Sequence, residues 1–206
     1  MFGFDPDMIF RIPALLITLT IHEYAHARVA VSLGDPTPRF LGRLTLNPIP
    51  HLDPIGLIML WLFKFGWAKP VPVNPANFSN ERMGMLWVAF AGPASNILLA
   101  LLTAIVITLS YPFGLLTDEV LKMLRWIYTY NIIFAIFNLL PIPPLDGGKI
   151  VASLLPPRMA YTYEKIEPYG TWILMALVWV GVAGVVIYPL QSVLHKAISF
   201  IVNIIF

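Results

Sequence analysis

The chain has 206 residues, of which 58% are hydrophobic and 12% are charged. An ordinary soluble domain is about a quarter charged, and one of this size could not bury so much apolar surface, so the composition indicates a membrane protein. The net charge of +2, without a basic cluster, gives no indication of nucleic-acid binding. Cysteine is absent, so any metal site must use histidine and carboxylate ligands.

The N-terminal half begins with one long apolar run and one short run. A membrane-spanning helix needs roughly 20 apolar residues. The first run covers about 8–33, with Asp7 as a candidate N-cap and Gly34 and Pro36 at its end. The second, 55–65, is too short to cross, and it predicts a short re-entrant or interfacial helix.

Four further apolar segments follow along the chain. The third run covers about 83–109, and the fourth covers about 120–140 and ends in a proline cluster. A fifth run covers about 171–188, and Pro189 separates it from the last segment, 190–206. Whether this last segment spans the membrane completely is open.

Two connecting segments, about 39–46 and 69–75, are expected to be extended rather than helical. In the second, proline at alternate positions prevents a helix and suits strand edges. We therefore predict an all-α polytopic membrane protein with a small β or extended membrane-associated region. It would form one domain over residues 1–206, with a core of about 8–155 and C-terminal helices at about 171–206.

The distribution of charge predicts the orientation in the membrane. Basic residues gather in the connections after the first and fourth spans: Arg39, Arg43, Lys64, Lys69, Arg82, Lys149, Arg158 and Lys165. Acidic residues mark the opposite side: Asp5, Asp7, Asp118 and Glu119. The positive-inside rule then places the N-terminus outside and the long connections in the cytoplasm, with Lys122 and Arg125 as exceptions.

The strongest motif is His22-Glu23-Tyr24-Ala25-His26, an HExxH pattern inside the first apolar run. Residues four apart lie on one face of a helix, so both imidazoles can hold one metal ion. Glu23 projects to a neighbouring side, from which it can reach a metal-bound water. In a soluble helix such residues often form a solvated face, but their cost inside a membrane segment favours a functional site.

A catalytic zinc usually has three protein ligands, so a third ligand is needed. His51 and His195 are candidates, but His195 lies in the last apolar segment, beyond every other motif. Asp146 is the better candidate, because it follows a proline-broken helix and precedes two glycines that allow close backbone approach. The same residue could instead cap a helix over about 147–155, or it could do both.

The HExxH run is followed over a hundred residues later by Asn138-Leu-Leu-Pro-Ile-Pro-Pro-Leu-Asp146-Gly-Gly. This order of motifs resembles the site-2 protease family of intramembrane metalloproteases, and the resemblance extends to about residue 155. It implies an HExxH-type zinc metalloendopeptidase in which His22, His26 and Asp146 bind one Zn²⁺ and Glu23 is the general base. It also implies that the first, third and fourth spans form a three-helix catalytic core.

A second element, Ala91-Gly92-Pro93-Ala94-Ser95-Asn96, resembles the GPxxN element of the same family. Its small residues allow two helices to approach closely. Asn96 has an amide suited to hydrogen-bond a zinc ligand or an oxyanion, so we predict that Asn96 and Asn138 are catalytic residues. For both, an interhelical hydrogen bond without a catalytic role is an equally good interpretation.

The segment from Gly42 to Pro54 resembles the extended region after the first helix in compact family members. The family implies a small sheet there, whose free edge can pair with an unwound substrate. His51 could assist at the site, although we favour a role within the loop. Family members often carry a PDZ or CBS domain, and this chain has room for neither.

The resemblance implies an enzyme that cleaves transmembrane protein substrates within or next to their spans. We expect it in the lipid bilayer of a prokaryotic cell membrane, with its site nearer the cytoplasm. A metal-ion transporter or channel using the same ligands is one alternative, but it leaves Glu23 unexplained. A non-catalytic adaptor is another, disfavoured because all four site positions are intact. The substrate and the oligomeric state stay open.

Overall fold

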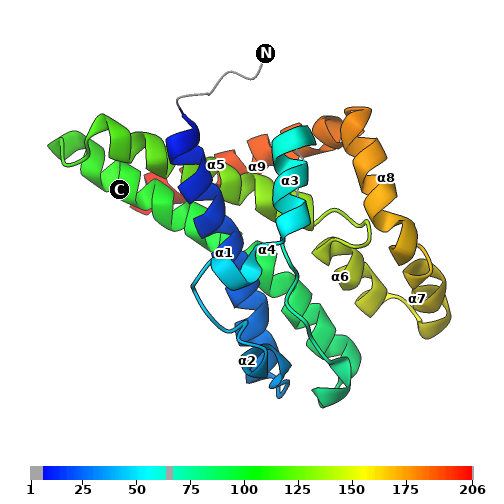
Figure 1. Ribbon diagram of the computed structural model, residues 1–206. Coiled ribbons are helices and arrows are strands. Elements are labelled where there is room, and N and C mark those ends of the chain that lie inside the picture. The colour runs from blue at the N-terminus through cyan, green and yellow to red at the C-terminus, as the bar shows by residue number, and fades with distance from the viewer. Residues whose placement is uncertain (1–6, 64–66, 206) are drawn as a thin grey trace.

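The computed structural model describes residues 7–63 and 67–205, and this part of the chain is built from helices (Figure 1). Among the described residues, four helices are long and apolar enough to cross a membrane. They are α1 (Met8–Ser32), α4 (Glu81–Ser110), α5 (Asp118–Asn138) and α9 (Val182–Ile205). The predicted all-α polytopic membrane architecture is therefore confirmed.

Shorter helices connect and flank these four. They are α2 (Thr37–Phe40), α3 (Pro54–Phe63), α6 (Asp146–Leu154), α7 (Pro157–Glu164) and α8 (Glu167–Trp179), with 3-10 turns η1 (Ile49–His51), η2 (Pro75–Asn77) and η3 (Tyr111–Phe113). With ten residues, α3 is a short helix as predicted and is not among the candidate spans.

Local sequence explains where the long helices begin. The Asn80 side chain accepts the Met83 N–H at 3.0 Å ahead of α4, and Thr117 caps α5 through the Val120 N–H. Acidic residues in the first turns of α4 and α5 suit the positive end of each helix dipole. Asp7 precedes α1 as predicted, but its side chain makes no capping hydrogen bond.

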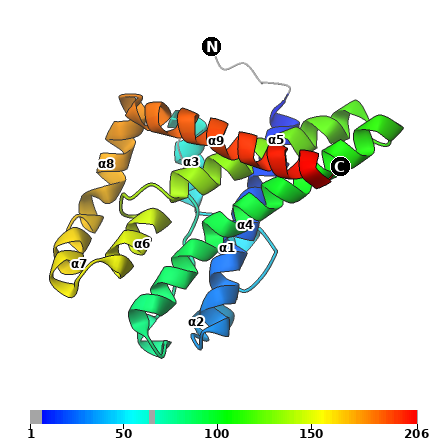
Figure 2. The ribbon, with the colours of Figure 1, turned by 180° about the vertical axis from the view of Figure 1, so that it is seen from behind.

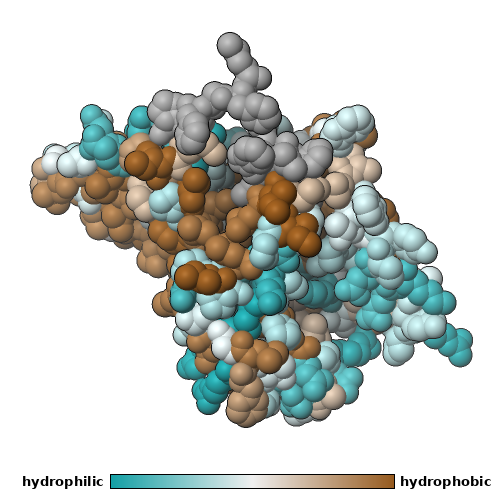
Figure 3. Space-filling model, viewed as in Figure 1, coloured by the Kyte–Doolittle hydropathy of each residue, from teal (hydrophilic) through white to brown (hydrophobic). Residues whose placement is uncertain are grey.

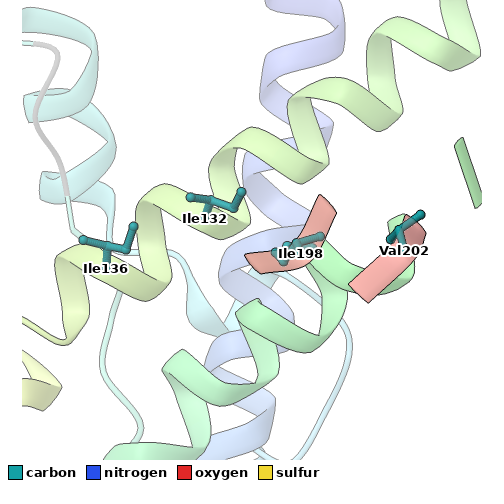
Figure 4. Close-up of a cluster of buried hydrophobic side chains, with 5 residues drawn as sticks. Ile132, Ile136, Ile198 and Val202 are labelled. Atoms are coloured by element: carbon teal, nitrogen blue, oxygen red, sulfur yellow. The ribbon is translucent and has the colours of Figure 1, made fainter. Parts of the chain in front are cut away.

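The helices α1, α4 and α5 form the core, since each contacts the other two, and α6 packs on α4. Helix α9 lies across α4 and α5, as the view from behind shows (Figure 2). Buried side chains of α5 and α9 meet Ala100 of α4 in one apolar cluster: Ile132, Ile136, Ile198 and Val202 (Figure 4). The first, third and fourth predicted spans are thus in mutual contact.

Apolar and polar surfaces occupy different parts of the molecule. Hydrophobic residues cover much of the side formed by the C-terminal part of α4 and the N-terminal part of α5 (Figure 3). Hydrophilic residues gather around α6 and α7. On α4 the exposed side chains include Leu98, Leu102, Val106 and Leu109. The apolar surface of α4 and α5 suits contact with lipid, whereas the polar surface of α6 and α7 suits a more aqueous environment.

The predicted small sheet is not seen. Within the described residues there is no strand, and the only pairing of this kind is an isolated antiparallel bridge between Leu52 and Ala68. Residues 37–40, partly assigned to the extended segment, form α2. Residues 69–74 are non-helical as expected, but Pro70 and Pro72 lack the N–H groups that a ladder requires.

The predicted break at Pro189 is also wrong. Pro189 lies inside α9, and the chain turns instead between α8 and α9, at Gly181 with φ of 81°. Only glycine adopts this left-handed conformation readily, whereas proline is tolerated within membrane helices. The fifth predicted run, about 171–188, therefore covers the C-terminal part of α8 and the beginning of α9, and the last apolar segment is the rest of α9.

Candidate metal centre

The HExxH residues lie in the second half of α1, the helix that packs against α4 and α5. His22, Glu23 and His26 are buried, with exposed fractions of 5%, 8% and 6%. Because residues four apart share a helix face, the two imidazole rings lie together, with centroids 4.6 Å apart. Asp146, equally buried, joins them from the first turn of α6.

Three potential ligand atoms converge at this point. The Nε2 atoms of His22 and His26 are 3.0 Å apart, and Asp146 Oδ2 lies 3.1 Å from each of them. Each edge of a tetrahedral zinc site with ligand bonds of about 2.0–2.2 Å would be about 3.3–3.6 Å long. The triangle is therefore close to one face of such a site, and this group is one that could hold a metal ion.

Hydrogen bonds on the far side of each ring determine where the protons are. His26 Nδ1 lies 2.7 Å from the Val88 carbonyl oxygen, which can only accept, so Nδ1 carries the proton. The amide nitrogen of Asn96 donates to the Thr18 carbonyl at 3.2 Å, which leaves Asn96 Oδ1 to accept from His22 Nδ1 at 2.6 Å. In the neutral rings, both Nε2 lone pairs therefore point towards each other.

The residues present fit a cation. Asp146 Oδ2 is buried and receives no hydrogen bond in the described part of the chain. Two nitrogen lone pairs and an anionic oxygen at about 3 Å repel one another unless a positive charge lies between them. Two imidazoles and one carboxylate form the donor set of many catalytic zinc sites.

Two asparagines connect the three core helices behind His22. The amide nitrogen of Asn96 donates to Asn131 Oδ1 at 2.7 Å. Asn131, fully buried in α5, donates to Thr18 Oγ1 of α1 at 2.9 Å and to the Ile127 carbonyl at 2.8 Å. Sequence analysis missed Asn131, although an amide inside an apolar run is the kind of residue that indicates such a network.

Gly92 allows α4 to lie directly against the imidazoles. A Cβ at this position would be 2.5 Å from His22 Cε1 and 2.6 Å from His26 Cε1. Real Cβ atoms do not approach other atoms so closely. The small residue in the GPxxN element is therefore required by the histidine rings themselves, in addition to helix packing.

Asp146 is the first residue of α6, and its side chain caps nothing. Leu145 is the N-cap residue, and no side-chain capping bond is formed, so the capping interpretation of Asp146 is wrong. The carboxylate points instead to the histidines through Oδ2, while Oδ1 lies 3.7 Å from Lys149 Nζ. Gly147 packs against the Leu139 and Leu140 carbonyls, so α6 begins in contact with the end of α5.

Glu23 faces a different neighbour, the connection between α3 and α4. Its Oε2 accepts the Val71 N–H at 3.0 Å. In Figure 1 this connection descends past the crossing of α1 and α4. A carboxylate that follows one of the histidines on the same helix and is held by a backbone amide can accept or donate a proton.

Comparison with known proteins identifies the family of the chain. The family model described as peptidase family M50 matches residues 112–181. The Bacillus subtilis (strain 168) protein YwhC, whose name assigns it provisionally to the zinc metalloproteases, is 36% identical over 208 residues. That match covers 97% of this chain and 93% of YwhC. The chain belongs to peptidase family M50, the site-2 protease family.

Other M50-type relatives are longer. Rip2 of Mycobacterium tuberculosis (strain H37Rv) is 30% identical over 201 residues, covering 88% of this chain and 73% of Rip2. Rip3 of the same strain is 33% identical over 147 residues, covering 68% of this chain and 30% of Rip3. The names of Rip2 and Rip3 also assign these proteins provisionally to the zinc metalloproteases. No solved structure matches the chain.

Three other residues considered in the sequence of this M50 chain make contacts apart from His22, His26 and Asp146. Asn138 donates to the Phe134 carbonyl of its own helix at 3.1 Å, so its catalytic role stays a prediction. His51 is fully buried and bonds the Thr45 carbonyl at 2.9 Å through Nε2, which agrees with a role within the loop. His195 Nδ1 pairs with Tyr128 Oη at 2.6 Å, between α9 and α5.

Proposed function

We propose that this M50 protein is an intramembrane zinc metalloendopeptidase that hydrolyses peptide bonds within or next to transmembrane segments of membrane proteins. One observation carries the proposal. Two imidazole nitrogens and a carboxylate oxygen converge at 3.0–3.1 Å, beside a buried glutamate, on helices long enough to span a membrane. The proposal includes one Zn²⁺ per chain, with His22, His26 and Asp146 as ligands.

In this proposal the chain's own residues divide the work between them. A zinc ion held by these ligands would act as a Lewis acid and would lower the pKa of a coordinated water to about 7. Glu23 Oε2 is held by the Val71 amide, which leaves Oε1 to take a proton from the attacking water. The same oxygen then gives that proton to the leaving amine, so that Glu23 serves first as base and then as acid.

The asparagines have supporting roles in this proposal. Asn96 and the Val88 carbonyl keep both Nδ1 atoms protonated, so the Nε2 lone pairs stay directed to the metal. Asn96 therefore acts through His22, whereas Asn138 remains a candidate for contact with the substrate. Because carbonyls in a membrane helix are hydrogen-bonded, the substrate must unwind locally before its scissile carbonyl can approach.

We further propose that residues 1–206 act as one domain in a prokaryotic cell membrane, with the site nearer the cytoplasm. The basic connections after α1 and α5 support this orientation through the positive-inside rule. The M50 relatives reported above are bacterial, which supports a prokaryotic membrane. The partners in this proposal are a transmembrane protein substrate and the lipid bilayer.

The test measures zinc content together with cleavage of a model single-span substrate in proteoliposomes. We expect about one zinc per chain in the wild type and in Glu23→Gln, and much less in His22→Ala and Asp146→Ala. Cleavage should occur only in the wild type. Because Glu and Gln have nearly the same shape, Glu23→Gln separates proton transfer from folding.

Other outcomes would support the rival functions. Stoichiometric metal with no cleavage, accompanied by zinc flux into the proteoliposomes, would support a transporter or channel. Metal with neither cleavage nor flux would support an adaptor. Full zinc content and activity in Asp146→Ala would refute the third ligand, and full activity in Glu23→Gln would refute the general base.

A further inference from the structure

The segment 69–73, here called the strap, lies against the proposed general base. Val71 N–H donates to Glu23 Oε2 at 3.0 Å, although the two residues are 48 positions apart. Pro70 and Pro72 flank Val71 and have no N–H of their own. The strap therefore presents one amide to the carboxylate, and its flanking prolines keep the backbone extended.

A buried arginine holds the strap in place. Arg43 is 4% exposed, and its Nη2 donates to the Lys69 carbonyl and, at 3.0 Å, to the Pro70 carbonyl. These are the two peptide groups immediately before Val71. The Nε of Arg43 is buried and makes no hydrogen bond within the described residues, so the two Nη2 bonds are what join this guanidinium to the strap. Burying a guanidinium is costly, so these two bonds fix the strap at that point.

Arg43 also interacts with Glu23 through its charge. Burial lowers the pKa of Arg43, and the nearby carboxylate of Glu23 opposes that shift. Arginine keeps its proton even when buried, so the group stays cationic throughout the physiological range. The strap is thus held by a cation that lies close enough to the proposed general base to attract it.

A second hydrogen bond holds Lys69, this time through its backbone N–H. Lys69 N–H donates to the His51 carbonyl at 3.0 Å, next to the bridge between Leu52 and Ala68. His51 is itself fully buried and bonded to the Thr45 carbonyl. Lys69 is therefore fixed through both its N–H and its C=O, which leaves the neighbouring Val71 amide little freedom.

We propose that Arg43 is a positioning residue, which holds the strap so that the Val71 amide fixes the Glu23 carboxylate for proton transfer. The proposal rests on the role of Glu23 in the function proposed above. A free glutamate samples several rotamers, whereas proton transfer requires the carboxylate at hydrogen-bonding distance from the water. One hydrogen bond from the Val71 amide to Oε2 selects the rotamer of Glu23 and leaves Oε1 available.

The first test removes the amide or its anchor and measures cleavage. Val71→Pro deletes the N–H, and Val71→Ala keeps it while changing the side chain, so Val71→Ala is the reference. Relative to it, we expect Val71→Pro to lower kcat about 10- to 150-fold, the range that corresponds to the loss of a hydrogen bond to a charged group. KM should change by less than about 2-fold, because ground-state binding is not altered.

Arg43 is tested in the same assay. Arg43→Gln should lower kcat by a similar factor, and Arg43→Lys should recover part of it, since lysine keeps the charge and one donor. Zinc content should equal that of the wild type in both. The double variant with Val71→Pro should be no slower than the single variants, because both changes remove the same contact.

The second test needs no activity. Only Lys69, Val71 and Val73 carry amide hydrogens in the strap, so hydrogen exchange of this peptide reports directly on its anchoring. In zinc-loaded protein, Arg43→Gln should speed exchange at Lys69 and Val71, and Glu23→Ala should speed it at Val71. Unchanged exchange in both variants would overturn the proposal.

The two tests separate the possible failures. Faster exchange with unchanged kcat would overturn the positioning role of Arg43. Increased cleavage in Arg43→Gln or Val71→Pro would also overturn it, because the strap would then restrain the site. If the wild type cleaves no better than Glu23→Gln, the proposed function fails, and the exchange measurement still decides whether Arg43 holds the strap against Glu23.

Discussion

Substituting Gly92 by alanine should weaken metal binding without removing a ligand. The added methyl would lie 2.5 Å from His22 Cε1 and 2.6 Å from His26 Cε1. Carbon atoms in contact are about 3.5–4.0 Å apart, so the rings and α4 must separate by about 1 Å. Because α4 also holds Asn96 and Val88, this movement strains the hydrogen bonds that orient both imidazoles.

Overpacking of this kind typically costs about 1–3 kcal/mol. If the metal-bound arrangement bears that cost, zinc affinity should fall about 5- to 150-fold, since about 1.4 kcal/mol corresponds to a factor of ten. The measurement is a competition titration of purified protein with a zinc chelator of known affinity. His22, His26 and Asp146 all remain present, so any loss reports on their geometry.

Gly84→Ala is the matched control, because it makes the same chemical change in the same helix. A Cβ there would lie 2.9 Å from Phe78 Cβ, away from the metal ligands. We expect Gly84→Ala to lower thermal stability and to leave zinc affinity near that of the wild type. Wild-type zinc affinity in Gly92→Ala would refute the close approach of α4 to the imidazoles.

Two further predictions follow from buried polar groups. Asn131→Leu should lower zinc affinity about 10-fold, since Asn96 loses one of its partners, whereas Thr129→Val, an exposed position on the same helix, should not change it. Burial raises the pKa of Asp35, but hydrogen bonds from Thr37, Asn74 and Asn77 outweigh burial and lower that pKa below its usual value. A carboxyl group with a depressed pKa stabilises the fold above about pH 4 and loses that contribution as pH falls. The difference in Tm between the wild type and Asp35→Asn should therefore shrink in acid, and a constant difference would contradict this assignment.

The sequence by itself determined the class of protein and the chemistry of its site. Composition predicted a membrane protein, and hydropathy located α1, α4 and α5 to within about two residues at most ends. These properties are local, because an apolar run of sufficient length must form a helix in lipid. The spacing of His22 and His26 is equally local, since a helix brings residues four apart onto one face.

The meeting of Asp146 with the two histidines was predicted from a resemblance, and the structure brings these three side chains together. The break between the last two helices was predicted at the wrong residue. Proline prevents a helix in water, but a membrane helix accommodates Pro189, and the left-handed φ of Gly181 makes the turn. The predicted sheet is absent from the described residues, where residues 37–40 form α2 and Pro70 and Pro72 lack the N–H groups that a ladder requires.

Only the tertiary structure decided what holds the site in place. Val88 and Asn96 orient the histidines, Asn131 joins the three core helices, and the strap reaches Glu23. Each contact joins residues between 35 and 74 positions apart. A backbone carbonyl or amide has no signature in the amino-acid sequence, because every residue except proline carries both groups. Their use at this site depends on how the helices pack, which no local pattern encodes.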